Sequence, residues 1–533
     1  MSEGIYVIAI DIGTTGVKTC LFNITDKITL LCSELKGYNL YVLEDGGAEQ
    51  DPNEWWEAIC LTTRDIIKNS NIPADKISGV SFCSQMQGLV LVDKDGMPVR
   101  RAMSYMDQRA YKEHKDGISH GLKVANVNIV KLLRSLQITG AVAASVKDPV
   151  WKYKWVESNE PDNFKRVYKW LDVKEYIISR FTGEYIMTEG SAFATLLYDT
   201  RRRKGCWSKA ICNMLGVNME HLPKIVKSTD VVGYITEVAA VELGLDKGTP
   251  VFGGGGDAEL IGIGAGAIDI GSTHVYLGTS GWVSTVIDRQ KVDVNTMIAG
   301  IVGAQTGLYN YFAEMETAGK CLEWVKDHLA LDEIGIYLEK KQITESIEKV
   351  YTSLYDYVCK VVLEAKAGCD GVIFTPWLHG NRCPFEDPNA RGMFFNISLF
   401  TGKTELIRAV IEGVCYHNRW MLEAQDRLIK TSETIRFVGG GALSETTCQI
   451  LSDVLGRKVE TVENPQNVGA VGAAILVAIG LKEIESFSKA KSLISVKNTY
   501  TPNFDNKEIY DKNYVVFKNL YKYNKKNYRL LNH

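Results

Sequence analysis

The chain has 533 residues, of which 45% are hydrophobic and 23% are charged, and its formal net charge is -3. These values are typical of a globular protein and give no reason to expect nucleic acid or an anionic membrane as a partner. The length exceeds what one hydrophobic core supports, so we expect two domains with small additions. No apolar run approaches the ~20 residues that span a bilayer. The twelve cysteines form no Cys-x-x-Cys pair, so we expect reduced, mostly buried thiols and a cytoplasmic location.

The chain opens with an apolar run at residues 5–10 that lacks the basic flank and cleavage site of a signal peptide, so we predict a strand. A glycine-threonine turn follows at residues 11–18, Asp-Ile-Gly-Thr-Thr-Gly-Val-Lys. Its glycines let a ligand approach the backbone, and its hydroxyl and amide groups suit phosphate. We predict that phosphate is bound by Gly13, Thr14, Thr15 and Lys18. An ordinary hairpin is the alternative. A carboxylate cannot bind phosphate directly, so we predict that Asp11 holds Mg²⁺ through water.

The rest of the first half alternates strands and helices. Residues 5–43 indicate a strand meander, and residues 51–67 a helix that begins with an early proline and acidic residues. Residues 77–84 predict a buried strand, and residues 110–245 are expected to be mainly helical.

The second half begins near residue 250, where four consecutive glycines precede Asp257. These glycines would let substrate and phosphate crowd against one carboxylate, which could accept the proton of a hydroxyl nucleophile. We therefore predict that Asp257 is a catalytic base. A purely structural role as a helix N-cap is the alternative for the same residue, and Asp257 can have both roles.

A second glycine-threonine turn, Leu-Gly-Thr-Ser-Gly, lies at residues 277–281, and we predict that phosphate is bound there by Gly278, Thr279 and Ser280. The similar residues 269–273 are expected to be only the loop that leads into the preceding strand. Two such turns, one in each half, predict two similar domains that hold one polyphosphate from opposite sides.

Further along the chain we expect helices at about residues 312–330, 345–366 and 405–428. The short strand at 436–438 ends in three glycines, and Gly440, Gly441 and Ser444 are predicted to form a platform for a flat base. From about residue 485 the chain is polar and weakly patterned, so we expect an extension that ends in a short solvated helix or a frayed end. His379 and His417 are expected to be core or surface residues without a catalytic role.

These motifs, in this order, resemble those of the FGGY family of carbohydrate kinases, and the resemblance covers about residues 5–480. Residues 408–416 are similar to the family's C-terminal signature helix. The resemblance implies an α/β, ribonuclease H-like fold with two domains, as in sugar kinases, Hsp70 and actin, and an active-site cleft between them. It implies ATP and Mg²⁺ as cofactors, a small sugar as substrate and a homodimer. The domains expected are an N-terminal domain at 1–250, a C-terminal domain at 251–484 and an extension at 485–533.

Within the family, residues 48–56, 387–392 and 451–457 are most similar to segments of xylulokinases. The likeness implies substrate contacts from Gln85, Met86, Gln87, Asp107 and Asp257. Two positions depart from the xylulokinase pattern: Gln87 stands where histidine is usual, and Ala258 where asparagine is usual. D-xylulose is therefore the first candidate substrate, and ribulose, gluconate, erythrulose and glycerol stay open. A non-kinase ATPase like actin or Hsp70, a transcriptional regulator and an inactive sugar binder are the alternatives.

Overall fold

The computed structural model describes residues 4–532 apart from 125–126, 202–203, 330–356 and 358–359. The first half is built on a seven-stranded sheet in the order β16-β17-β6-β1-β2-β3, with β18 also paired to β6. Its strands are β1 (Ile5–Ile12), β2 (Gly16–Ile24), β3 (Ile28–Gly37), β6 (Ile77–Ser84), β16 (Val231–Tyr234), β17 (Pro250–Phe252) and β18 (Gly255–Gly256).

The second half is built on an eight-stranded sheet in the order β21-β22-β23-β20-β19-β26-β27-β28. Its strands are β19 (Thr273–Leu277), β20 (Gly281–Ile287), β21 (Val292–Asp293), β22 (Ile298–Val302), β23 (Tyr309–Met315), β26 (Thr434–Val438), β27 (Lys458–Val462) and β28 (Val496–Tyr500). In both sheets an antiparallel hairpin (β1-β2, β19-β20) lies beside a parallel strand (β6, β26). The predicted duplication of architecture is therefore confirmed.

Strand β1 is apolar along almost its whole length because helices cover both faces of its sheet. Its central residues, 7–10, are fully buried. Helix α1 (Pro52–Ser70) packs on β2 and β3, whereas α16 (Val468–Gly480) packs on β1 and β6. A strand that is buried on both faces loses the alternation of apolar and polar residues.

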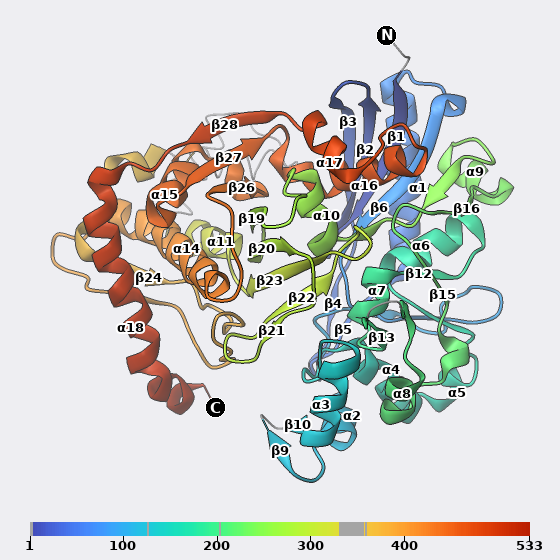
Figure 1. The fold of residues 1–533 in the computed structure, drawn as a ribbon, viewed down its shortest axis with the longest axis horizontal. Helices are drawn as coiled ribbons and strands as arrows, with labels where there is room; N and C mark the ends of the chain where they lie inside the picture. Colours follow the sequence, from blue (N-terminus) through green and yellow to red (C-terminus); the bar gives the residue numbers. More distant parts are fainter. Residues whose placement is uncertain (1–3, 125–126, 202–203, 330–356, 358–359, 533) are drawn as a thin grey trace.

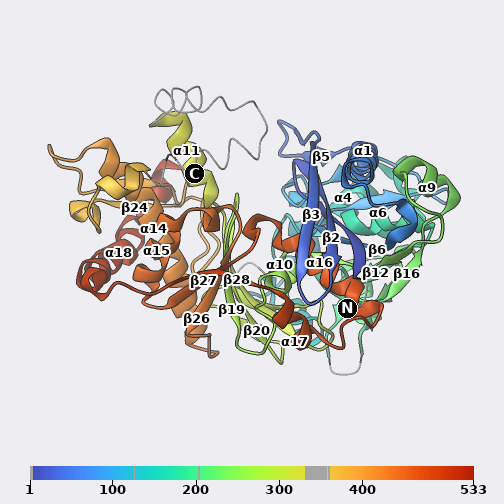
Figure 2. The same cartoon turned by 90° about the horizontal axis from the view of Figure 1, so that it is seen from above.

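Helices α10 (Asp257–Gly264) and α16 join the two halves. Both views place them between the two sheets (Figures 1 and 2). Their packing depends on glycine, because a Cβ atom on Gly264 would lie 1.8 Å from the Val468 carbonyl oxygen and one on Gly472 would lie 2.4 Å from that of Leu260. The boundary expected between residues 250 and 251 falls inside the first sheet, since β17 and β18 both pair with β6.

Helices dominate residues 110–245, as predicted, with short strands between them. These helices are α2 (Tyr111–Ile118), α3 (Ile129–Ile138), α4 (Pro149–Asn159), α5 (Pro161–Phe164), α6 (Val173–Thr182), α7 (Glu189–Ala194), α8 (Lys209–Leu215) and α9 (Glu237–Leu243). Those of the second half are α11 (Gly319–His328), α14 (Lys403–Asp426), α15 (Glu445–Leu455), α17 (Phe487–Ala490) and α18 (Lys507–Leu531).

Several expectations for the second half can be checked. Helix α14 confirms the helix expected at 405–428, and residues 269–272 form the expected loop before β19. The helix expected at 312–330 is wrong in its first part, because residues up to Met315 form β23 in the centre of a sheet. Most of the helix expected at 345–366 lies outside the described residues.

No disulfide joins the described cysteines, most of which are buried. No described helix is long and apolar enough to cross a membrane.

The extension expected from residue 485 ends in a helix that is largely exposed at residues 522–529, but this helix is longer than expected and packs on the second half. Strand β28 pairs with β27, and α18 is a helix of 25 residues that packs on α14 and α15 along the edge of the second half (Figure 1). Tyr510, Tyr514 and Phe517 recur at helical spacing and are almost fully buried. Lysines and asparagines between them hid this apolar stripe from a reading of composition.

The stripe generates a stability prediction. Phe517 is fully buried and its ring lies 5.6 Å from that of Trp377. Phe517→Ala should lower the free energy of unfolding by about 3–5 kcal/mol, because it leaves a cavity in the core. Val515→Ala, on the exposed side of the same helix, should change it by less than about 0.5 kcal/mol. Urea denaturation followed by tryptophan fluorescence measures both, and equal effects would contradict the packing of α18.

Candidate active site

The first glycine-threonine turn is the tight connection between β1 and β2. The Gly13 amide donates to the Gly16 carbonyl at 2.9 Å, while Thr15 is exposed. The turn is held from behind, because the Gln50 side chain donates to the Thr14 carbonyl at 2.7 Å and Tyr38 donates to the Gly13 carbonyl. Its outer hydroxyls and amides are therefore presented on a fixed backbone, which suits a phosphate group.

Asp11 stands at the end of β1 and lies against the start of α16. A Cβ atom on Gly469 would lie 3.1 Å from the Asp11 carboxylate and 2.8 Å from the Cys83 sulfur, so this glycine allows the helix to approach. Burial raises the pKa of Asp11, and nearby Lys18 opposes the rise. The Lys18 ammonium donates to the Asn467 side chain at 2.9 Å, which ties the first turn to the segment before α16.

Asp257 is the first residue of α10, directly after β18. Gly256 is the N-cap residue, so the alternative that Asp257 is itself the N-cap is wrong, although its carboxylate accepts the Ala258 amide at 2.7 Å. Burial raises the pKa of Asp257 to about 7, and the negative charges of Asp11 and Glu314 add to the rise. A carboxyl group with a pKa near neutrality is suited to exchange a proton with a substrate.

The side chains near Asp11 determine whether a metal ion fits there. No group of three or more histidine, cysteine or acidic side chains that could hold a metal occurs in the described part of the chain. Burial, however, raises the pKa of both Asp11 and Asp257, and the negative charge of Asp11 adds to the rise at Asp257. A cation would relieve this, and Mg²⁺ is commonly held by one or two carboxylates, with water and substrate phosphate as the other ligands. The residues therefore fit Mg²⁺ held mainly by water and phosphate.

A buried network that the sequence reading missed supports the Asp257 segment. Glu259 accepts the Gly256 amide at 3.2 Å, the half of a capping box that a glycine N-cap allows, and burial raises the pKa of Glu259 to about 8. The Lys174 ammonium pairs with buried Glu175, and its positive charge opposes the rise in the pKa of Glu259. The acid three residues after the N-cap was the one local signal that could have revealed this support.

The predicted substrate wall divides into two parts. Met86 lies against Gly256, the residue before Asp257, because a Cβ atom on Gly256 would lie only 2.1 Å from the Met86 sulfur. Gln85 is instead buried, and its amide donates to Gln50 at 3.0 Å, behind the first turn. Gln87 is half-buried with a left-handed backbone, φ 63°.

Asp107 is fully buried and lies behind this wall. Its carboxylate accepts the Ala48 amide at 2.9 Å and pairs with Arg109 at 2.7 Å, and Arg109 also pairs with Glu49 at 2.7 Å. The structure therefore gives Asp107 protein partners, and its contact with substrate stays a prediction.

The second turn connects β19 to β20, as the first connects β1 to β2. The Gly278 amide donates to the Ser280 carbonyl at 3.0 Å, and Thr279 is exposed. The amides of Ala318 and Gly319, at the start of α11, donate to the carbonyls of Thr279 and Gly278. These bonds fix the turn from the side of the helix.

The predicted base platform adjoins the second turn. Gly439 has φ 90°, and a Cβ atom there would lie 2.6 Å from the Leu277 carbonyl oxygen. A Cβ atom on Gly441 would lie 2.8 Å from the Leu277 side chain, so this glycine segment rests on the strand that carries the turn. Ser444 is buried and caps α15 by accepting the Thr447 amide at 3.1 Å. Its contact with a nucleotide stays a prediction.

Charged residues from the second half face Asp257. Arg382 pairs with Glu314 and with Glu316, the latter at 3.1 Å. Burial raises the pKa of Tyr105, and the charges of Asp257 and of both glutamates add to the rise. The Tyr105 hydroxyl lies 3.5 Å from that of Thr14. The two halves therefore line one site. Sequence reasoning missed the two glutamates because β23 was not predicted.

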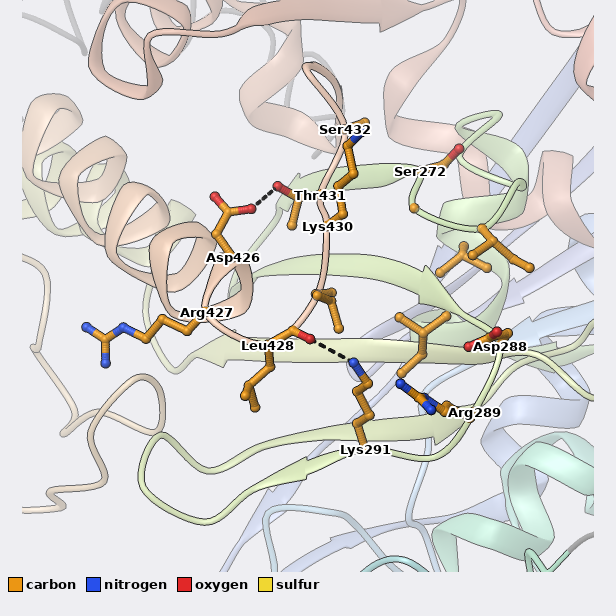
Figure 3. A pocket seen from close by; sticks show the side chains of 15 residues that line it. Ser272, Asp288, Arg289, Lys291, Asp426, Arg427, Leu428, Lys430, Thr431 and Ser432 are labelled. Atoms are coloured by element: carbon orange, nitrogen blue, oxygen red, sulfur yellow. Dashed lines mark hydrogen bonds between the residues drawn. The ribbon is translucent and has the colours of Figure 1, made fainter.

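A surface cavity of about 950 Å³ lies at the other end of β19 and β20 (Figure 3). It is lined by residues 270–272, 286–291 and 426–432, apart from residue 290. Lys291 reaches the Leu428 carbonyl, and Asp426 accepts the Thr431 hydroxyl. None of the predicted site residues lines this cavity, so it is separate from the candidate active site.

Comparisons with known proteins identify the family of this chain. The N-terminal domain of the FGGY family of carbohydrate kinases matches residues 6–264, and its C-terminal domain matches residues 274–481. A xylulose kinase of Bacillus subtilis is 28% identical over 523 residues (98% of this chain, 97% of the relative), and a gluconokinase of the same organism is 28% identical over 517 (97% and 95%). The solved structure of a ligand-bound xylulose kinase from Lactobacillus acidophilus superposes with a TM-score of 0.84, at 25% identity, covering 99% of each chain.

Fold and site together define a two-domain sugar kinase of the actin and Hsp70 type. The chain belongs to the FGGY family of carbohydrate kinases. It is a phosphotransferase with an alcohol group as acceptor, it acts on a small sugar, and kinases of this family use ATP. The resemblance that rested on the motifs is confirmed.

The raised pKa of Asp257 generates a prediction for the metal-free protein. Its pKa is 3.8 in the unfolded chain and about 7 in the folded one, so its ionisation destabilises the fold as pH rises through this window. Asp257→Asn removes this penalty. The free energy of unfolding of the variant minus that of the wild type should therefore increase by a few kcal/mol between pH 5 and pH 8. Urea denaturation across this pH range tests the prediction. A stability difference that does not depend on pH would contradict the raised pKa of Asp257.

Proposed function

We propose that this protein transfers the γ-phosphoryl group of ATP to a primary hydroxyl of an open-chain sugar, with D-xylulose, converted to D-xylulose 5-phosphate, as the best candidate. The observation that carries the proposal is Asp257, a half-buried carboxyl whose pKa is raised to about 7 and which directly follows the residue, Gly256, that Met86 contacts. Family membership supports the reaction class, and the arrangement of the motifs supports the roles that follow.

ATP would lie between the halves, with its phosphates between the two turns. The proposed phosphate contacts are the side chains and amides of Gly13, Thr14, Thr15, Lys18, Gly278, Thr279 and Ser280. Gly440 and Gly441, which adjoin the second turn through Leu277, would support the adenine. Mg²⁺, held by Asp11 through water, would neutralise phosphate charge when bound.

The chemical step would begin when the Asp257 carboxylate accepts the proton of the sugar hydroxyl. The freed oxygen forms a bond to the γ-phosphorus while the bond to the bridging oxygen breaks, and the electron pair leaves on ADP. Hydroxyl and amide donors of the two turns stabilise the charge that develops on the phosphoryl oxygens. Closure of the halves about α10 and α16 would exclude water and limit hydrolysis of ATP.

The charges around Asp257 favour a neutral sugar over a sugar acid, although both a xylulose kinase and a gluconokinase are similar to this chain. Asp11 and Glu314 both raise the pKa of Asp257, so the field there is negative. Arg382 is already paired with two glutamates. A sugar carboxylate would be repelled unless a cation were released to meet it. Ribulose, erythrulose and glycerol remain the neutral alternatives, and the homodimer and cytoplasmic location stay predictions.

An ADP-release assay with Mg·ATP and a panel of ketopentoses, tetruloses, glycerol and gluconate tests the proposal. The wild type should release ADP with a neutral open-chain sugar, D-xylulose first. Asp257→Asn should lower kcat about 100- to 10,000-fold, because the proton acceptor is lost, and should leave ATP binding intact.

Asp269→Asn is the matched control, because Asp269 lies in the similar loop before β19 and pairs there with Lys491. It should keep wild-type turnover. Wild-type turnover in Asp257→Asn would remove the proposed base. Folded protein that binds ATP but releases ADP with no member of the panel would contradict the proposed substrate class.

A further inference from the structure

Gln87 has a backbone conformation that a residue with a side chain seldom adopts. Its φ is 63°, in the left-handed region that favours glycine. The next residue, Gly88, is buried, and a Cβ atom there would lie 2.9 Å from the Asp172 carboxylate. Such a conformation persists only where the surroundings hold it, and it is common at ligand sites.

Two buried side chains from separate helices hold this backbone. Asp172, at the start of α6, accepts the amides of Gln87 and Gly88, each at 2.9 Å. Lys152, on α4, donates its ammonium to the Gln87 carbonyl at 2.8 Å. Asp172 is 5% exposed and Lys152 is 0% exposed. We refer to Lys152 and Asp172 as the Gln87 clamp.

The clamp places two ionisable groups in the protein interior, which is costly. Burial lowers the pKa of Lys152 to about 8 and raises that of Asp172 to about 7. Neither group forms part of the phosphate turns, and both are bonded to the backbone that carries Gln87. This use of buried charge indicates that the direction of one side chain matters.

The Gln87 side chain is available to a ligand. The side chain is half-buried. Unlike the backbone amide, which donates to Asp172, the side-chain amide has no hydrogen-bond partner among the residues that the structure describes. Its neighbour Met86 lies against Gly256, next to Asp257. A glutamine amide both donates and accepts hydrogen bonds, as the hydroxyl groups of a sugar do.

We propose that Lys152 and Asp172 are positioning residues that hold the Gln87 backbone and so fix the direction of its side-chain amide. They thereby determine which arrangement of sugar hydroxyls the site accepts. The inference rests on the proposed function, since it gives the clamp its meaning for a sugar. It places the control of specificity in α4 and α6, outside the loop that touches the substrate.

A double-mutant cycle tests the proposal. In the wild-type background, Asp172→Asn should raise KM for the accepted sugar about tenfold and leave KM for ATP within about twofold. In the Gln87→Gly background the same change should alter the sugar KM by less than about twofold. Glycine adopts φ 63° without support, and it has no side-chain amide to position.

The cycle separates positioning from a direct effect. Asp172 also acts on the charge of Asp257, and a loss that came through Asp257 or through folding would persist in the Gln87→Gly background. An equal loss in both backgrounds, or no loss in the wild-type background, overturns the proposal. Asp162→Asn, at an exposed carboxylate, is the matched control and should change neither constant.

Amide hydrogen exchange in the sugar-free protein tests the clamp without reference to activity. Asp172→Asn and Lys152→Met should each accelerate exchange of the Gln87 and Gly88 amides at least tenfold, and leave the amides of β1 unchanged. Lys154→Met, on the same helix and paired with Glu157, should have no effect. Unchanged exchange in both folded variants overturns the clamp. Accelerated exchange in a protein that phosphorylates no sugar would contradict the proposed function and leave the clamp standing.

Discussion

The close packing of α10 against α16 is the constraint on which the site depends. Each helix begins at the site: α10 with Asp257, and α16 beside Asp11 through Gly469. The helices can approach because Gly264 and Gly472 lie against the backbone of the partner helix, where any larger residue would clash. Both carboxylates are thereby half-buried. Desolvation raises the pKa of each, and the charge of Asp11 adds to the rise at Asp257. The packing of two helices thus influences the electrostatics of the proposed reaction centre.

The duplicated sheets support the proposal that the two turns face one site. In each half a hairpin lies beside a parallel strand, so each glycine-threonine turn leaves its sheet in an equivalent place. The joining helices bring these equivalent edges together. The site gathers several acidic groups at the cost of stability, an arrangement often found where a fold retains chemistry.

Local signals in the sequence predicted the parts of the site that form locally. The strand predicted at 77–84 is β6, and both turns lie where their glycines indicated. Parts that depend on distant contacts were not predictable: Lys152 and Asp172 reach Gln87 from other helices, and Glu314 lies on a strand whose pattern was mistaken for a helix. The buried stripe of α18 was hidden because its large residues are tyrosines among lysines and asparagines. Periodicity reports the face of one element and not its partner.

The central claim is that the two turns hold one nucleotide with its γ-phosphate beside Asp257. A crystal structure with Mg²⁺, a non-hydrolysable ATP analogue and the accepted sugar tests it most directly. The account predicts that amides of both turns, at residues 13–15 and 278–280, contact the phosphates, and that a primary hydroxyl of the sugar lies about 3 Å from the Asp257 carboxylate. A nucleotide that contacts only one turn, or a sugar whose primary hydroxyl is remote from Asp257, would contradict the account.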